Sequence, residues 1–388
     1  MNSYNPHFKL MACLLIICLI ISTGSVSAAN TKQDLMQAAI EYARGVLHGF
    51  VNTNNVIVTW TEATDITSVI LLYDPTDNIN GAIINLETEG KPNGFIQVGL
   101  NDDYWYVVNL AFEGDNYLIG LINSNDNLKN DFDSILNQKI YYIGGFSYFI
   151  HNCKGELVSL ENGMILDEPI DTLLPIYNKF CSRLREFEVD SDITVGTRTS
   201  NYYHVDGWDV AADYMRSTQY YQTLISGLNS HCTPTAAVNL IMYWKYGRDF
   251  FVNNSASQLT VFNWFYNQMG TNNGQNGTLP SNVQQPIAYY VGTYSGASST
   301  PTGRITSVTF NKIKSKCDSD IPLVLDIDDY TDDGKHTVNV WGYNISNNIN
   351  YLFITNNWGT NGSNYVTFSL MNYGAYTCSH FVYANLIE

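Results

Sequence analysis

Seven short runs of β-branched and aromatic residues recur along the first half of the chain and restrict how it can fold. Clusters of Asn, Asp, Gly and Pro separate these runs, a pattern typical of strands joined by tight turns. A segment of helical periodicity, residues 32–46, precedes them. We therefore predict a small α+β domain on an antiparallel sheet. The expected strands are residues 56–60, 68–73, 81–86, 94–98, 104–112, 116–122 and 139–149.

The charge of the chain excludes two classes of partner. Nineteen Lys and Arg face 36 Asp and Glu, a net charge of −17. The acidic excess is concentrated in residues 30–200, which carry 24 acids and 10 bases, against 12 and 8 in residues 201–388. A chain this acidic has no general electrostatic attraction for nucleic acid or for an anionic membrane surface. We expect neither partner.

The N-terminus has the pattern of a secretory signal peptide. Lys9 precedes an apolar run over residues 10–21, and small residues follow at positions 26–29. Cleavage after Ala28 or after Ala29 fits equally well. The alternative is a permanent membrane anchor, but the run is shorter than the roughly 20 residues that span a bilayer. We predict a signal peptide over residues 1–28 and a secreted protein with no membrane association after cleavage.

Five cysteines remain after the signal peptide: Cys153, Cys181, Cys232, Cys317 and Cys378. In an oxidising compartment an odd number leaves a reactive thiol, an intermolecular partner or a buried thiol. The disulfide pairing of Cys153, Cys181, Cys317 and Cys378 stays open. There is no CxxC pair and no HExxH run, so no zinc site is indicated. We expect neither a metal nor an organic cofactor.

The second half differs from the first and follows a polar segment without apolar periodicity, residues 186–203, which we interpret as a linker. Residues 208–224 and 305–317 have a helical pattern. Thr233 and Pro234 are a plausible N-cap and first residue of another helix, which ends near Gly247. The strands expected after it, over residues 322–327, 336–343, 351–355, 365–370 and 380–386, indicate an antiparallel sheet or half-barrel.

Three polar residues of this half form a candidate catalytic set. Cys232 stands at a helix entrance, where the helix dipole and a nearby imidazolium favour the thiolate. His336 begins a strand that would hold the imidazole rigidly. Asn356 follows the next strand, and its carboxamide oxygen could fix the tautomer of the ring. Trp358 could shield that hydrogen bond from water.

These local forms resemble the papain-like cysteine peptidases. The segments that carry the resemblance begin at Cys232, at Gly334 and at Asn356, and read CTPTAA, GKHTVNVWGY and NNWG. They are most similar to the C39-like peptidases, with the streptopain family as a near relation, over about residues 205–388. The resemblance implies a papain-like catalytic domain over residues 204–388, in which the helix that carries the nucleophile packs on the sheet.

The streptopain family is made with a β-rich propeptide. The resemblance therefore implies that residues 29–185 are a β-rich α+β prodomain, which would act as an intramolecular inhibitor and chaperone. It also implies a Cys232–His336–Asn356 mechanism on protein or peptide substrates, without a cofactor. The expected function is a secreted cysteine endopeptidase made as a zymogen.

The oxyanion hole departs from the family pattern. The papain-like enzymes have a Gln six residues before the nucleophile, where this chain has Ser226. Asn229, or less favourably Gln222, could supply the carboxamide donor, with the backbone N–H of Cys232 as the second donor.

Two other functions stay open at this point. A cell-wall amidase of the NlpC/P60 or CHAP kind also uses a Cys followed by a His, although such enzymes commonly place a His or an acid third. The departure at Ser226 also leaves open a non-catalytic binding protein on a degenerate peptidase scaffold.

Overall fold

The structure is a computed structural model of the 388-residue chain. It describes residues 31–51, 59–101, 104–112, 114, 116, 118–119, 122, 135, 137–144, 147–160, 165–166, 169–189, 201–251, 254–295, 302–328, 335–346, 349–357, 367–370 and 377–386. The predicted signal peptide, residues 1–28, lies outside these ranges. None of the helices within them combines the length and the apolar character needed to cross a membrane.

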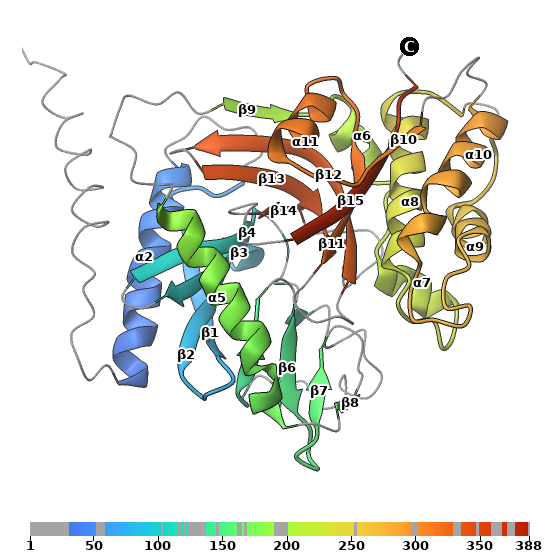
Figure 1. Ribbon diagram of the computed structural model, residues 1–388. Helices are drawn as coiled ribbons and strands as arrows, with labels where there is room; N and C mark the ends of the chain where they lie inside the picture. Colours follow the sequence, from blue (N-terminus) through green and yellow to red (C-terminus); the bar gives the residue numbers. More distant parts are fainter. Residues whose placement is uncertain are drawn as a thin grey trace, which may run out of the picture.

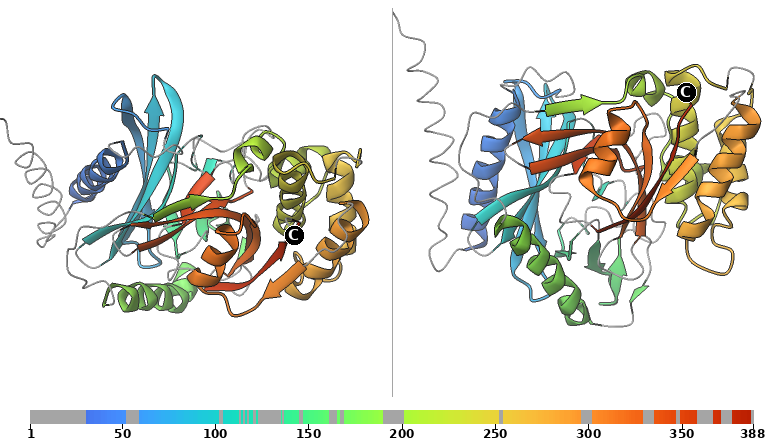
Figure 2. Two further views of the ribbon diagram at one scale, coloured as in Figure 1. Left: turned by 90° about the horizontal axis from the view of Figure 1, so that it is seen from above. Right: turned by 45° about the horizontal axis from the view of Figure 1, so that its top comes forward.

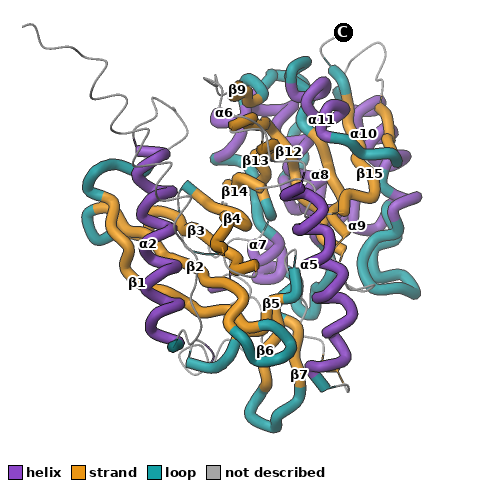
Figure 3. The backbone as a smooth tube through the Cα atoms, turned by 60° about the vertical axis from the view of Figure 1, so that its left-hand side comes forward, coloured by secondary structure: helices purple, strands orange, loops and turns teal. Residues whose placement is uncertain are grey.

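The first half folds as an antiparallel sheet covered by a helix. The strands β1 (Thr64–Tyr73), β2 (Ile79–Thr88), β3 (Lys91–Asn101) and β4 (Tyr104–Ala111) pair in sequence order. The helix α2 (Lys32–Val51) lies along this sheet (Figures 1 and 3). Its buried residues Ala39, Ala43 and Leu47 recur at a spacing of four, which puts them on one face of the helix. The expected α+β class is confirmed here.

Shorter elements extend the sheet beyond β1. These are β5 (Ile140–Tyr142), which runs parallel to β1, then β6 (Tyr148–His151), β7 (Leu157–Ser159) and β8 (Ile165–Leu166). The 3-10 turn η2 (Ile170–Leu173) and the helix α5 (Leu174–Val189) follow.

Three strand predictions in this half need correction. Residues 118, 119 and 122 are helical, so the strand expected at 116–122 is wrong there. The run 139–149 contains two strands, because the chain turns at Gly144, whose φ of 113° suits glycine. Residues 59 and 60 lie before β1 and are not in a strand, and the rest of the run 56–60 is not described.

The second half consists of an antiparallel sheet with helices packed beside it. Its strand order is β10-β15-β11-β12-β13-β14. The strand β9 (Asn201–His204) is not part of this order and pairs antiparallel with β12. The other strands are β10 (Thr302–Ile305), β11 (Leu323–Asp328), β12 (Lys335–Ser346), β13 (Ile349–Thr355), β14 (Thr367–Leu370) and β15 (Thr377–Ala384). The expected antiparallel sheet is confirmed, and the half-barrel stays a prediction.

Helices gather beside this sheet, with α7 (Thr218–Leu224), α8 (Cys232–Met242), α9 (Gln258–Gln268) and α10 (Gln284–Tyr294) on one side in Figure 1. Of these, α8 contacts both β11 and β12. The segment expected as one helix, 208–224, is two: α6 (Trp208–Ala212) and α7. The run 305–317 is helical only in α11 (Phe310–Cys317), since its first residue ends β10. The π-helical turn η3 (Tyr243–Gly247) ends α8, and the 3-10 turn η4 (Pro280–Asn282) precedes α10.

The two halves share one continuous sheet. The strand β14 pairs antiparallel with β4, and Ser369 lies opposite Leu110. Figure 2 shows the sheet of the first half meeting that of the second from two further directions. The predicted units 29–185 and 204–388 are thus joined by main-chain hydrogen bonds as well as by the chain itself. Within the expected linker 186–203, α5 extends to Val189 and β9 begins at Asn201; residues 190–200 are not described.

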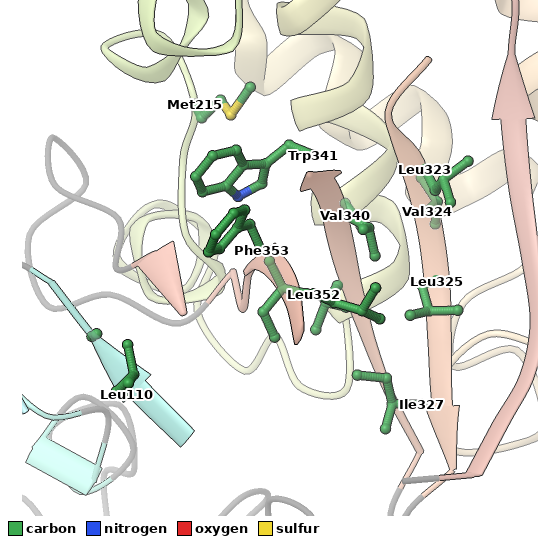
Figure 4. Close-up of a cluster of buried hydrophobic side chains, with 14 of the residues drawn as sticks. Leu110, Met215, Leu323, Val324, Leu325, Ile327, Val340, Trp341, Leu352 and Phe353 are labelled. Carbon is green, nitrogen blue, oxygen red and sulfur yellow. The ribbon is translucent and has the colours of Figure 1, made fainter. Parts of the chain in front are cut away.

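Large aromatic side chains fix β12 in the second half. Trp341 stacks on Trp208 of α6, with ring centroids 5.9 Å apart, and on Phe353 of β13 at 5.3 Å. Figure 4 shows Trp341 and Phe353 side by side, with Met215 beyond the indole and Val340 on the same strand. All four side chains are buried. This packing anchors the strand that carries His336.

Candidate active site

Cys232 is the first residue of α8, and His231 occupies the N-cap position. The helix therefore begins earlier than expected, since Thr233 is already inside it. Cys232 is partly exposed and is not in a disulfide, whereas every later residue of α8 is buried. The first N–H groups of a helix have no acceptor within the helix, and its positive end favours a thiolate. The position of Cys232 thus suits both a nucleophile and an oxyanion donor.

His231 has a structural role beside the thiol. Its Nε2 lies 2.9 Å from the main-chain oxygen of Thr218, at the start of α7. A carbonyl oxygen only accepts, so Nε2 carries the proton. Burial lowers the pKa of His231, which favours the neutral ring. This geometry gives His231 a local packing role at the start of α8.

His336 is the second residue of β12 and is only 2% exposed. Its Nε2 lies 2.6 Å from the main-chain oxygen of Asn356 and must donate to it, because a carbonyl cannot donate. In the neutral ring, Nδ1 is then the nitrogen without a proton and the one able to take a proton from a thiol. Burial lowers the pKa of His336 to about 4, against the opposing effect of the Asn356 hydrogen bond.

Asn356 contacts the ring through its main chain in this hydrogen bond, whereas the sequence suggested the carboxamide oxygen. Its neighbour Asn357 joins three segments. The Asn357 Oδ1 accepts from Asn239 Nδ2 of α8 at 2.7 Å, and its Nδ2 donates to the main-chain oxygen of Thr337 at 3.2 Å. Its own main-chain oxygen accepts from the N–H of Thr218 at 2.7 Å. A left-handed φ of 61° at Asn357 turns the chain so that these contacts are made together.

Two direct contacts bring the start of α8 to β12. The hydroxyls of Thr233 and Thr337 are 2.7 Å apart, and Asn339 Nδ2 donates to the main-chain oxygen of Ala236 at 3.0 Å. Thr233 follows Cys232, and Thr337 follows His336. The structure therefore places the neighbours of the predicted nucleophile and base in contact, although they are about a hundred positions apart in the sequence.

The predicted oxyanion donors differ in how they are held. Asn229 is exposed, and its Oδ1 accepts from Asn272 Nδ2 at 3.0 Å, which leaves the Asn229 amide N–H groups able to donate. Gln222 uses its Nε2 to bind the main-chain oxygen of Leu228 at 3.1 Å. Ser226 is exposed on the loop between α7 and α8. Trp358, predicted to shield the imidazole, lies outside the described residues.

Sequence reasoning missed the polar residues of β12. Valines alternate with Thr337 and Asn339 along this strand, a pattern typical of one buried face, yet Thr337 is 3% exposed and Asn339 is fully buried. The only sequence signal was the presence of hydrogen-bonding side chains on a strand next to a candidate base. In the part of the chain that is described, no cluster of three or more His, Cys, Asp and Glu side chains could hold a metal ion.

Comparison with protein families identifies a match in the second half of the chain. Residues 213–380 match the family model described as Peptidase_C39 like family. The match contains α7, α8 and the strands β10 to β14, and therefore Cys232, His336 and Asn356. No curated protein matches the chain. The resemblance expected from the sequence is confirmed for the C39-like family, and the streptopain-like organisation stays a prediction.

Proposed function

On the premise that residues 213–380 are a C39-like peptidase region, we propose that this protein is a secreted cysteine endopeptidase made as a zymogen. The family match supports a peptidase of the cysteine type, acting on proteins or peptides. Within that class, we assign the nucleophile to Cys232, the acid and base to His336, and the orientation of the ring to Asn356.

The observation that carries this assignment is the joining of α8 to β12. The Thr233–Thr337 hydrogen bond lies one residue beyond both proposed reactants, and the His336 Nε2–Asn356 hydrogen bond leaves Nδ1 to serve the thiol. A nucleophile and a base held by rigid elements need little reorganisation to react.

The chemistry follows from these positions. Cys232 Sγ loses its proton to His336 Nδ1 and attacks the substrate carbonyl carbon. The C=O bond becomes C–O⁻, which the N–H of Cys232 and the Asn229 amide stabilise. When the oxyanion collapses, the C–N bond breaks and His336 gives its proton to the leaving amine. Water, deprotonated by His336, then hydrolyses the thioester and restores the thiol.

Burial affects which charge state precedes the attack. A pKa of about 4 for His336 favours a neutral imidazole at neutral pH. Proton transfer from Sγ would therefore accompany substrate attack in this form of the chain. A standing thiolate–imidazolium pair would need a more polar surrounding for His336 than the intact chain provides.

The first half would be the prodomain. It carries most of the acidic excess, follows the expected signal peptide and pairs with the second half through β4 and β14. Processing within the segment 190–203 would separate it from the enzyme outside the cytoplasm. The same strand pairing would let it assist the folding of β14 before release.

The test compares the secreted wild type with Cys232→Ala and with Cys153→Ala, which removes an exposed thiol of the first half. Mass spectrometry follows cleavage near residues 190–203, and turnover of casein and of peptidoglycan fragments is measured in parallel. We expect casein turnover in the wild type and in Cys153→Ala, and none in Cys232→Ala. Equal turnover by all three proteins would remove the assignment of Cys232, and turnover of peptidoglycan alone would favour a cell-wall amidase.

A further inference from the structure

A line of buried polar side chains leads from the start of α8 across three strands. Its members, here called the polar row, are Thr233, Thr337, Asp326 and His380. The Thr233 and Thr337 hydroxyls are 2.7 Å apart, Thr337 Oγ1 donates to Asp326 Oδ1 at 2.7 Å, and His380 Nε2 lies 3.1 Å from Asp326 Oδ2. Each of the four residues is at most 6% exposed.

Strand register explains why these side chains meet. Asp326 of β11 lies directly opposite Thr337 of β12 and opposite His380 of β15. Directly opposite residues of paired strands project from the same face of a sheet. That face is the one covered by α8, because Thr233 of α8 reaches Thr337.

The hydrogen bonds of the polar row have one direction. Thr337 has a single hydroxyl proton and gives it to the Asp326 carboxylate, so its oxygen must accept from the hydroxyl of Thr233. Asp326 accepts at both of its oxygens, one from Thr337 and the other from His380. Every link thus depends on the next, and loss of the carboxylate would free Thr337 to turn its proton elsewhere.

A buried carboxylate is costly unless its hydrogen bonds are complete, and breaking one side of such a pair is strongly destabilising. No member of the polar row takes part in the proposed reaction steps. One end of the row, Thr233, is nevertheless the residue after Cys232, and Thr337 within the row is the residue after His336. The row is therefore placed to control the relative position of the two reactants.

We propose that the polar row is a positioning device, in which Asp326 and His380 fix the Thr337 hydroxyl and Thr337 fixes the start of α8. Thr233, Thr337, Asp326 and His380 act through their neighbours and do not touch the substrate. This inference rests on the proposed function and names further residues on which its rate depends.

The test replaces the hydroxyl of Thr337 while keeping its shape. Thr337→Val removes both hydrogen bonds, and Thr337→Ser keeps them with one methyl group less. The matched control is Thr64→Val in the first half, which also removes a buried Thr hydroxyl, 2.7 Å from that of Thr88. All proteins are secreted as full chains and checked for folding by circular dichroism.

Two readouts separate positioning from general destabilisation: kcat and KM on a peptide substrate, and the rate of Cys232 alkylation by iodoacetamide from pH 4 to 9. We expect kcat of Thr337→Val to fall by about 10- to 100-fold, as a misplacement of up to about 1 Å predicts, with KM within about twofold. The pH profile of alkylation should also shift. Thr337→Ser should recover most of kcat, and Thr64→Val should match the wild type.

Because Thr337→Val lies in the core, Thr233→Val provides a milder second variant that removes only the terminal link of the row. Wild-type kcat and alkylation in both valine variants would overturn the positioning role. So would a fall in activity that merely equals the fall in folded protein. A wild type without peptidase activity would instead overturn the proposed function, and the alkylation of Cys232 would still test the polar row.

Discussion

Burial of His336 makes the stability of the fold depend on pH in a way that one substitution can isolate. In the unfolded chain the ring takes up a proton near its usual pKa of 6.5, whereas burial holds the folded pKa at about 4. The folded state therefore binds fewer protons between these values. Its stability is fully present above pH 6.5 and is lost as the pH falls towards 4.

The size of this loss follows from the two pKa values. Each unit between the folded and unfolded pKa corresponds to about 1.4 kcal/mol, so protonation of His336 costs about 3 kcal/mol at most. Between pH 7.5 and 4.5, most of that amount, about 2.5 kcal/mol, should disappear from the free energy of unfolding. This is a large part of the roughly 5–15 kcal/mol that stabilises a typical domain.

The assay is urea unfolding of Cys232→Ala, which prevents self-digestion, with and without His336→Gln. A glutamine amide can still donate to the Asn356 oxygen but does not titrate. His48→Gln, which removes an exposed imidazole on α2, is the control. We expect the pH-dependent loss to be about 2.5 kcal/mol smaller in the His336→Gln background than in the other two. The same loss in all three proteins would refute the reasoning, since His336 would then not be held neutral by the fold.

Two further outcomes follow from burial elsewhere. Cys317 is buried, and this burial raises its pKa. Iodoacetamide at pH 7.5 should therefore modify Cys232 and the exposed Cys153 in the native protein but should reach Cys317 only after unfolding. Peptide mass spectrometry can show which cysteines are modified. Trp341→Ala should lower the free energy of unfolding by about 3–5 kcal/mol, because it removes the ring that stacks on Trp208 and Phe353; a loss under about 1 kcal/mol in urea curves would mean that this core collapses around the gap.

Local pattern was enough to predict the elements that carry the candidate site. The start of α8, the strand of His336 and the turn at Asn356 each have a signal within a few neighbouring residues. The contact between Thr233 and Thr337 has none, because it joins positions 104 residues apart and depends on how α8 packs on the sheet. The burial of Asn339 was missed for the same reason.

Tertiary packing also overrode local preference in the helices that were missed. The helix α9 is rich in β-branched and aromatic residues, which favour strands. It is nevertheless helical, with the Ser257 side chain accepting from the N–H of Thr260 and with Val261, Phe262 and Phe265 buried on one face. Residues 118, 119 and 122 are a similar case: they are helical, but the apolar run that contains them in the sequence is too short to show its period and was interpreted as a strand.

The shared ladder between β4 and β14 has a consequence for any separation of the two halves. Detaching the first half would expose unpaired backbone N–H and C=O groups along β14. An exposed strand edge of this kind readily pairs with another extended chain. Cutting the connecting segment would therefore leave the two pieces associated until something competes for that edge. An extended polypeptide is the kind of competitor that fits, so the rate of dissociation after cleavage should rise with the concentration of unfolded chains.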